Sequence, residues 1–323
     1  MYDNYNITGN NNTIIINGNS NTINQQPNQK QNSDDFVNSK SFKLHPKKLQ
    51  TLEIAKLYRN IGDYKKSRNI FYCAKDVELW ADSKKIKYIS LCRSRMCPAC
   101  AWRKSIKLYK KALYAAINAL KTKNVNFIFV TLTIKNCSGD NLYNTVDKLL
   151  KAYRLLKNHG KLSRTLGSIK SLEITVNWKN MSYHPHLHIV FAVPEDYFVN
   201  PELYITIEEL RKNWADKLKI EDESYKRMLQ VDIKSFGNTY SLIKSLKEIT
   251  KYMIKYGDLA NTNINTNKRS KALSFIDNAT KGRRMVEFTG LFRVKEDKKI
   301  KKELEEEILQ YQFNYKNNLY EEI

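Results

Sequence analysis

Three segments in the middle of the chain have the residue patterns of β-strands. Residues 127–134 are rich in β-branched and aromatic side chains, with threonines on one face. Within residues 168–178, apolar side chains at 172, 174 and 176 alternate with polar ones, Glu173 among them. A polar loop at 179–183 leads into an apolar run that ends at Val193, so we expect the last two segments to pair as an antiparallel hairpin.

Helical periodicity appears in other parts of the chain. The predicted helices cover residues 104–122, 143–158, 206–218 and 242–256, the last ended by Gly257. A short strand is predicted at 231–236, and the charged residues after Arg293 are expected to form a helix or tail. Strands and helices mix without a regular βαβ repeat, which indicates an α+β fold with a central antiparallel sheet flanked by helices.

The charge of the chain indicates a polyanionic partner. Lys and Arg number 56 against 33 Asp and Glu, a formal net charge of +23 that is spread along the sequence. Nucleic acid is the usual partner of such a protein, although an AT-rich coding bias is an alternative source of lysine. We find no signal peptide and no apolar stretch long enough to span a bilayer, so we expect a cytoplasmic protein without a membrane partner.

The first 36 residues or so are dominated by Asn, Gln, Ser and Gly. Residues 9–14, Gly-Asn-Asn-Asn-Thr-Ile, recur in similar form at 18–23. A disordered tail is the favoured interpretation, because two such units bury almost nothing. A segment for self-association through cross-β stacking is the alternative. Either way, we expect it to be dispensable for chemistry.

The second strand of the predicted hairpin begins with His184-Pro-His186-Leu-His188. Side chains two residues apart in a strand point the same way, so His186 and His188 can bind one divalent ion; an exposed pair without a metal is the alternative. The hairpin brings Glu173 alongside them, and two imidazoles with one carboxylate suit Mg²⁺ or Mn²⁺ beside a phosphate. His184 is the rival third ligand, because Pro185 leaves its direction open.

A second candidate group lies on the helix predicted at 242–256. Tyr256 belongs to the apolar stripe that faces the core, whereas Glu248, Tyr252 and Lys255 share the flank beside it. A phenol is a poor nucleophile because its pKa is near 10, so a neighbouring cation and a metal-bound phosphate would help Tyr252 attack. One tyrosine among 20 is usually structural, and only the clustering favours catalysis.

Four of the five cysteines form a third group. Cys97-Pro-Ala-Cys100 is a tight Cys-x-x-Cys knuckle, and Cys73 and Cys92 precede it, which predicts a four-thiolate structural Zn²⁺ site; free thiols are the alternative. Cys137 is expected to be a separate buried or free thiol. Basic and aromatic residues around the knuckle are expected to contact phosphates and offer a stacking surface. They are Arg93, Arg95, Trp102, Arg103 and Lys104.

Taken in order, these motifs resemble the replication initiators of rolling-circle plasmids, within the HUH endonuclease superfamily. The resemblance covers about residues 70–295. It rests on the cysteine segment 92–103, on Phe129-Val-Thr-Leu-Thr133 with Asn136, on His184-Pro-His-Leu-His188, on Glu248-x3-Tyr252-x2-Lys255, and on the closing block 281–290. The Asn-rich start of the chain lies outside the family pattern.

The resemblance implies a defined reaction at a plasmid origin. The protein would nick one DNA strand through Tyr252, with the scissile phosphate on a metal at His186 and His188. The products would be a 5′-phosphotyrosine link and a free 3′-OH that primes the host polymerase, with a host helicase as a further partner. The order Glu248, Tyr252, Lys255 is similar to that of the single-tyrosine branch, in which the glutamate activates water for the terminating cleavage and the DNA is rejoined.

The resemblance also implies a domain order. We expect a tail at residues 1–40, a zinc-ribbon-like module with four cysteine ligands at 41–105, an HUH nicking and origin-binding domain at 106–295, and a charged tail at 296–323. A related relaxase or transposase is an alternative, although a relaxase usually carries its tyrosine before the histidine motif. A non-catalytic zinc-ribbon regulator of replication that binds DNA is an alternative from a different class.

Overall fold

The computed structural model describes residues 6–8, 15–17, 38–39, 42–81, 83–236, 238–251, 254–294 and 308–323. These residues divide into two compact units. The larger unit comprises the described parts of residues 50–73 and 91–304, and the smaller one those of 1–49, 74–90 and 305–323. No helix among the described residues is long and apolar enough to cross a membrane.

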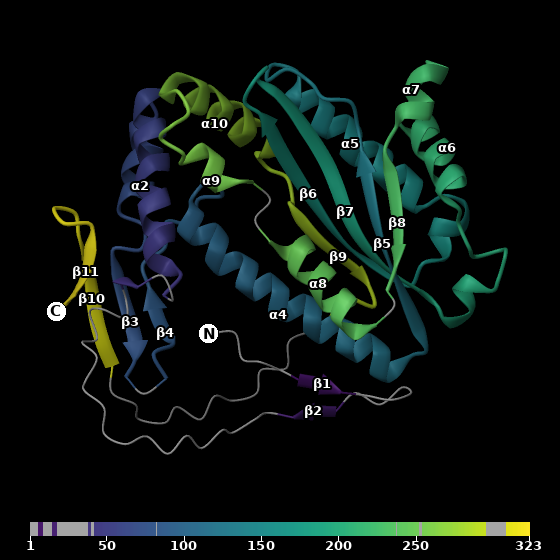
Figure 1. The fold of residues 1–323 in the computed structure, drawn as a ribbon, viewed down its shortest axis with the longest axis horizontal. Coiled ribbons are helices and arrows are strands. Elements are labelled where there is room, and N and C mark those ends of the chain that lie inside the picture. The colour runs from purple at the N-terminus through teal and green to yellow at the C-terminus, as the bar shows by residue number, and fades with distance from the viewer. Residues whose placement is uncertain are drawn as a thin grey trace. The chain divides into compact units, whose positions relative to one another are not determined.

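A five-stranded antiparallel sheet is the centre of the larger unit (Figure 1). Its strands, in the order β8-β5-β7-β6-β9, are β8 (Val231–Ser235), β5 (Val125–Thr133), β7 (Ser182–Pro194), β6 (Gly167–Asn177) and β9 (Val286–Gly290). The predicted hairpin is confirmed, because β6 and β7 are adjacent and antiparallel and Glu173 pairs with His186. The expected α+β fold with an antiparallel sheet and flanking helices is also confirmed.

Helices cover both faces of this sheet. On one face, α4 (Pro98–Thr122) and α8 (Thr239–Thr250) pack over apolar side chains that include Val190 and Ala192 of β7. The small residues Ala112 and Ala116 let α4 approach the sheet closely. On the other face lie α5 (Leu142–Lys157) and α6 (Ile207–Lys217), with α10 (Thr266–Thr280) packed against α5. Further elements are α2 (Leu44–Asn60), α3 (Tyr64–Phe71), α7 (Glu223–Met228), α9 (Tyr256–Leu259), and the 3₁₀ helices η1 (Gly160–Arg164) and η2 (Glu195–Phe198).

The helix predicted at 242–256 is shorter than expected. It ends at Thr250, whose hydroxyl donates to the backbone carbonyl of Leu246, and Lys251 has an extended backbone. Ile254 instead forms a parallel bridge with Ile174 of β6, which a continuous helix does not allow. A β-branched residue preceding the break weakens helix propensity, and pairing with β6 satisfies the backbone of Ile254. The prediction that Glu248, Tyr252 and Lys255 share one helical flank was therefore wrong.

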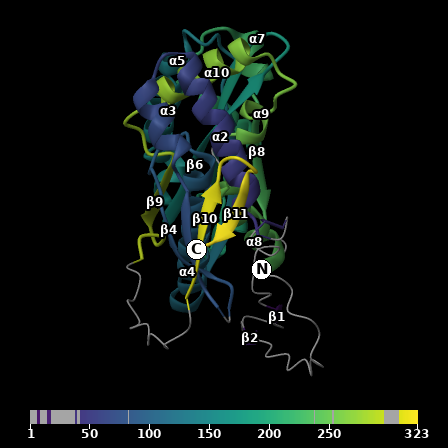
Figure 2. The same ribbon diagram turned by 90° about the vertical axis from the view of Figure 1, so that its left-hand side faces the viewer.

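The smaller unit contains a four-stranded antiparallel sheet in the order β11-β10-β3-β4. These strands are β3 (Asp76–Trp80), β4 (Ile86–Ile89), β10 (Ile308–Asn314) and β11 (Leu319–Glu322), and Figure 2 shows the hairpin of β10 and β11 in yellow. The expected charged helix or tail after Arg293 was wrong for residues 308–323. Tyr311, Phe313 and Tyr320 are buried here, and the alternation of Tyr311 and Phe313 with glutamines is a strand pattern.

At the start of the chain, the backbones of β1 (Asn6–Thr8) and β2 (Ile15–Asn17) pair antiparallel. Both copies of the Asn-rich repeat, at 9–14 and 18–23, lie outside the described residues. Self-association through this segment therefore stays a prediction. The domain boundaries expected near residues 40, 105 and 295 likewise stay predictions.

Candidate active site

The register of the sheet brings His186, His188 and Glu173 together. His186 pairs with Glu173 of β6 on one side and with Thr133 of β5 on the other. His188, two residues further along β7, pairs with Ser171 and Thr131. Because alternate residues of a strand share a face, both imidazoles and the carboxylate project from the same face of the sheet.

The three side chains meet around the Glu173 carboxylate. Its Oε2 lies 3.6 Å from Nε2 of His186 and 3.5 Å from Nε2 of His188. The candidate ligand atoms all lie within 4.8 Å of one another, and His186 is buried while the other two side chains are partly exposed. Two imidazole nitrogens and a carboxylate oxygen, open to solvent on one side, fit a divalent ion that keeps positions free for substrate.

Each histidine makes a second contact through Nδ1, which leaves Nε2 facing the Glu173 carboxylate. Nδ1 of His186 lies 3.1 Å from the backbone carbonyl of His184, and Nδ1 of His188 lies 3.2 Å from Oγ1 of Thr131. When Nδ1 carries the proton and donates it, Nε2 presents its lone pair to an ion. The role of Thr131 was missed from the sequence, where the only signal was threonine on one face of the strand.

Glu173 is held in its ionised form. Burial alone raises the pKa of this carboxyl, but the side chains of His186 and His188 outweigh it, so the net pKa lies well below its usual range. A carboxylate that stays ionised at neutral pH is the form that binds a cation.

His184 lies beside the cluster rather than in it. Its ring stacks on His186 with centroids 5.1 Å apart, and its Nδ1 lies 2.7 Å from Oδ1 of Asn136. Burial, followed by the neighbouring His186, lowers the pKa of His184. The geometry therefore favours Glu173 over His184 as the third ligand.

Of the other predicted catalytic residues, Glu248 and Lys255 are described, and neither belongs to this cluster. Glu248 is exposed on α8 and its carboxylate lies 3.4 Å from Nζ of Lys251, while Lys255 is exposed at the start of α9. Tyr252 lies outside the described residues. Its described neighbour in sequence, Ile254, pairs with Ile174, the residue that follows Glu173 in β6.

Tyr256 has a structural environment. It is buried, as expected for a residue on the packing stripe, and its hydroxyl donates a 2.6 Å hydrogen bond to the backbone carbonyl of Arg95. A phenol held in this way has to lose a buried hydrogen bond before it can attack a substrate. This position therefore argues against Tyr256 as a nucleophile.

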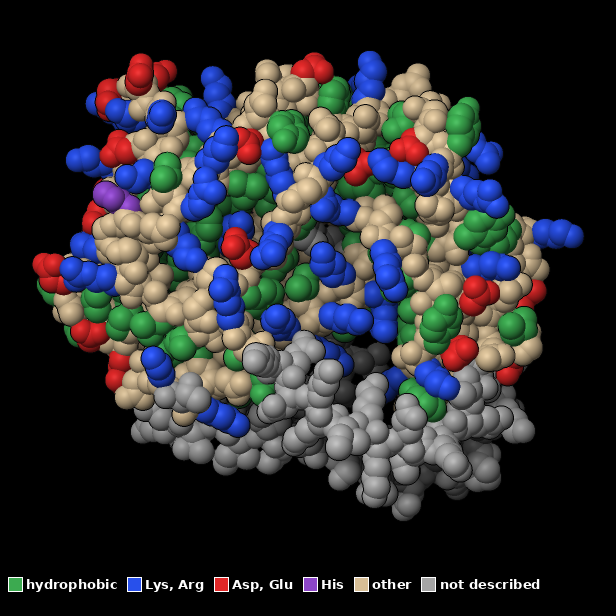
Figure 3. Space-filling model, turned by 180° about the vertical axis from the view of Figure 1, so that it is seen from behind, with side chains coloured by type: hydrophobic (Ala, Val, Ile, Leu, Met, Phe, Trp, Pro, Cys, Tyr) green, Lys and Arg blue, Asp and Glu red, His purple; other side chains and the backbone are tan. Residues whose placement is uncertain are grey.

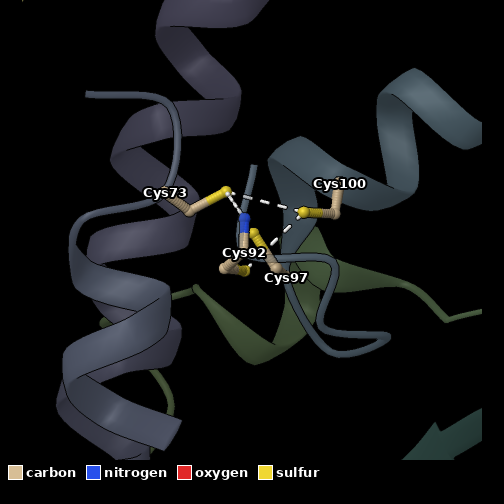
Figure 4. Close-up of side chains that lie close together, drawn as sticks. All are labelled: Cys73, Cys92, Cys97 and Cys100. Atoms are coloured by element: carbon tan, nitrogen blue, oxygen red, sulfur yellow. Dashed lines mark hydrogen bonds between the residues drawn. The ribbon is translucent and has the colours of Figure 1, made fainter. Parts of the chain in front are cut away.

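The four predicted zinc ligands converge in the larger unit (Figure 4). The Cys100 sulfur lies 3.5 Å from that of Cys73 and 3.6 Å from that of Cys92. Zn–S bonds of about 2.3 Å in a tetrahedron put the sulfurs roughly 3.8 Å apart, so the spacing fits Zn²⁺ and is far too long for disulfides. Cys97 begins α4 as its N-cap, and its sulfur lies 3.7 Å from the Thr51 hydroxyl.

The close thiols shift one another's pKa in opposite directions. Hydrogen bonds from Cys100 and then Cys73 lower the pKa of Cys92, whereas contacts with Cys100 and Cys92 raise the pKa of Cys73. The lowered pKa favours the thiolate form that binds a metal. Cys137 is separate from this group: its backbone bridges that of Tyr183, and burial raises the pKa of its thiol.

The basic surface near the knuckle differs in part from the prediction. Along α4, six Lys and Arg residues occur and no acidic residue does, and Lys104 is exposed. Trp102, however, is buried, and the Arg103 guanidinium lies 5.8 Å from its ring centroid, so the expected stacking surface is not formed by Trp102. Figure 3 shows lysine and arginine side chains across the middle of one face of the molecule.

Comparison with known proteins assigns the family. The family model described as "Replication protein" matches residues 83–322. "Protein rep" of Lentilactobacillus hilgardii is 30% identical over 276 residues, which are 83% of this chain and 84% of that protein. "Protein rep" of Lactiplantibacillus plantarum is 29% identical over 83% of this chain and 85% of its own length. "Protein rep" of Staphylococcus aureus is 32% identical over 55% of this chain and 75% of its own.

No solved structure gives a significant match. The family model spans most of the chain, and the motifs behind the expected resemblance fall almost wholly within it. The chain therefore belongs to the replication protein family, the initiators of rolling-circle plasmid replication.

Proposed function

We propose that this initiator binds its plasmid origin and nicks one DNA strand with Tyr252 as the nucleophile. The observation that carries the proposal is the cluster of His186, His188 and Glu173, together with the pairing of Ile254 beside it on β6. Tyr252 precedes Ile254 by two residues, whereas the competing Tyr256 is buried and its hydroxyl is engaged.

The cluster is proposed to hold Mg²⁺ or Mn²⁺ through Nε2 of both histidines and a Glu173 oxygen. When bound, the ion would polarise the scissile phosphate and offset its charge. The protein side chains do the positioning: the Glu173 carboxylate and the Nδ1 contacts orient both imidazoles, and the His184 carbonyl favours the Nδ1-protonated form of His186.

In the proposed step, the Tyr252 oxygen forms a bond to phosphorus and the bond from phosphorus to the 3′ oxygen breaks. The phenol releases its proton to solvent, and the departing 3′ oxygen takes one up from solvent. The products are a 5′-phosphotyrosine and a free 3′-OH. The 3′-OH primes the host polymerase, and a host helicase is the further partner. We propose that Glu248 activates water for the terminating cleavage, after which the DNA is rejoined.

The four-cysteine site is proposed to bind a structural Zn²⁺. Its ligands come from the residues after α3, the loop before α4 and the first turn of α4. A metal there ties three segments together and fixes the start of the basic helix α4. Its role is to support DNA binding rather than to take part in cleavage.

The test is a covalent-adduct assay on a labelled single-stranded oligonucleotide carrying the nick site of the plasmid origin. The wild-type protein with Mn²⁺ is expected to form an adduct that survives denaturing electrophoresis. Tyr252→Phe is expected to form none, and Tyr256→Phe, the matched control, to retain it if the variant folds.

Three other results of this assay would each contradict the proposal in a different way. An adduct that persists in Tyr252→Phe and disappears in a folded Tyr256→Phe protein moves the nucleophile to Tyr256. Origin binding without an adduct, with either metal, favours the non-catalytic zinc-ribbon regulator. An adduct on the 3′ side of the break contradicts the proposed polarity.

A further inference from the structure

A groove of about 550 Å³ opens beside the histidine strand. Its lining comes from the end of β5 and the segment after it, from the start of β7, and from α7 with its flanking residues. Thr133 and His184 both line it. Thr133 pairs directly with His186, so the groove begins about one strand spacing, roughly 5 Å, from the candidate metal site.

The lining has the chemistry of a base-binding site. Ile134 and Leu229 are buried and give an apolar floor, and the half-buried ring of Tyr225 gives an aromatic wall. Met228 adds a thioether that is 70% exposed, and Gln230 offers an exposed amide at the rim. Apolar and aromatic walls with a few polar groups are typical of small-ligand pockets, which span about 300–1,000 Å³.

Tyr225 is fixed in its place on the wall. Its hydroxyl accepts a 2.6 Å hydrogen bond from the backbone N–H of Lys135. Nζ of Lys135 lies 6.0 Å from the ring centroid. A ring held at both its hydroxyl and one face loses little further freedom when a flat ligand stacks on it.

The charges of the groove do not favour a phosphate as its occupant. Lys135 and Asp222 are the lysine and the carboxylate among its lining residues, and they oppose each other in sign. The Asp222 carboxylate accepts hydrogen bonds from the backbone N–H groups of Ser224 and Tyr225, so it caps α7 and stays ionised. A groove without net positive charge is poorly suited to the DNA backbone and well suited to a neutral base.

We propose that this groove binds one unpaired nucleobase of the single-stranded substrate, stacked on Tyr225, next to the scissile phosphate. The inference rests on the proposed nicking function for its substrate. Such a site would let the protein select the base next to the nick, because the hydrogen-bonding groups of Asn136 and Gln230 would contact the edge of the stacked base.

The test compares two probes that differ only in their bases. One is a fluorescein-labelled oligothymidylate, and the other is an abasic oligomer of the same length with the same backbone. Anisotropy titrations without added divalent ion measure binding to the full-length protein and avoid cleavage. The variants are Tyr225→Ala, Tyr225→Phe, which keeps the ring, and Tyr64→Ala, which removes an exposed tyrosine from α3 as a control.

Wild-type protein is expected to bind the oligothymidylate more tightly than the abasic oligomer. Tyr225→Ala should weaken binding of the oligothymidylate by about 5- to 100-fold, the effect of losing one base–aromatic stack, and leave the abasic affinity unchanged. Tyr225→Phe and Tyr64→Ala should behave as the wild type.

Equal losses for both probes, or no loss with either, would overturn the inference. The comparison stays informative if Tyr225→Ala is partly unfolded, because a smaller active fraction lowers binding of both probes alike. Failure of the wild-type protein to bind both these probes and the nick-site oligonucleotide contradicts the proposed nicking function itself. Normal binding that is insensitive to Tyr225 contradicts only the groove assignment.

Discussion

Thr131 and His188 are paired across β5 and β7, and the Thr131 hydroxyl lies 3.2 Å from Nδ1 of His188. On the far side of the ring, Nε2 of His188 lies 3.5 Å from the Glu173 carboxylate. The ring of Phe129 stacks on His188 at 5.5 Å between centroids. Together these contacts hold the orientation of a candidate metal ligand, and they are all made by neighbouring strands of one sheet.

Thr131→Val should therefore weaken metal binding without removing a ligand. Losing such an outer contact typically costs about 10- to 100-fold in metal affinity. Isothermal titration with Mn²⁺ measures the effect. Thr133→Val is the matched control, because the Thr133 hydroxyl donates to the backbone carbonyl of Gln230 rather than to an imidazole. Equal affinity in Thr131→Val and wild type would show that this hydroxyl does not orient His188.

Glu173→Gln should remove most of the affinity for Mn²⁺, because the amide oxygen lacks the charge that holds a hard cation. We expect the affinity for Mn²⁺ to fall at least about tenfold, because the loss of a ligand should cost no less than the loss of a residue that only contacts a ligand. Glu248→Gln makes the same chemical change on the exposed face of α8 and should leave Mn²⁺ binding unchanged. His184→Ala separates the two candidates for third ligand: a larger loss in His184→Ala than in Glu173→Gln would reverse the assignment.

Cys100→Ser should release the structural zinc. The Cys100 sulfur contacts those of both Cys73 and Cys92, so its loss opens the site. Metal analysis is expected to give one zinc per wild-type chain and none per variant chain, and the free energy of unfolding should fall by more than about 3 kcal/mol. Cys137→Ser should retain zinc. A zinc-free wild-type protein of unchanged stability would contradict this assignment.

The buried Tyr183 hydroxyl has no hydrogen-bond partner among the described residues, and burial raises the pKa of this side chain to about 12. A folded-state pKa above the ordinary value near 10 means that stability is full below pH 10 and is lost as the pH rises towards 12. Tyr183→Phe should stabilise the protein by about 1 kcal/mol, because it removes an unsatisfied buried hydroxyl. The variant should also lose less stability than the wild type as the pH rises above 10.

Thermal unfolding from pH 8 to 11 measures both effects of Tyr183→Phe. A gain of about 1 kcal/mol corresponds to a rise of roughly 1–2 °C in the melting temperature of a chain of 323 residues. The prediction would be contradicted if Tyr183→Phe were less stable than the wild type and lost as much stability above pH 10. That result would show that the Tyr183 hydroxyl has a partner that stabilises the fold.

The sequence predicted the parts of the fold that local periodicity controls. The strands predicted at 127–134 and 168–178 lie within two positions of β5 and β6. The helix predicted at 104–122 ends where α4 ends, but α4 begins six residues earlier, at Pro98. The pairing of Glu173 with His186 followed from the hairpin that the short polar loop favours. The sequence therefore named the residues of both candidate clusters, although it left Glu173 and His184 as rival third ligands of the divalent ion.

The errors occurred where tertiary contacts override periodicity. The helical pattern of α8 continues past Thr250 in sequence, but pairing of Ile254 with Ile174 ends the helix. The strand at 308–314 pairs with β3, more than 200 residues away, and nothing local marks that partner. The groove beside His184 depends on α7 approaching β5 and β7, a placement that no single segment encodes.

The most direct test of the account is to identify the residue that carries the DNA. Wild-type protein would be reacted with the nick-site oligonucleotide and Mn²⁺, digested with nuclease and protease, and analysed by tandem mass spectrometry. The account predicts a single modified peptide in which Tyr252 bears the 5′-phosphate of the nucleotide after the nick. A nucleotide on Tyr256 or on any other residue, or cleaved DNA without a modified peptide, would contradict it.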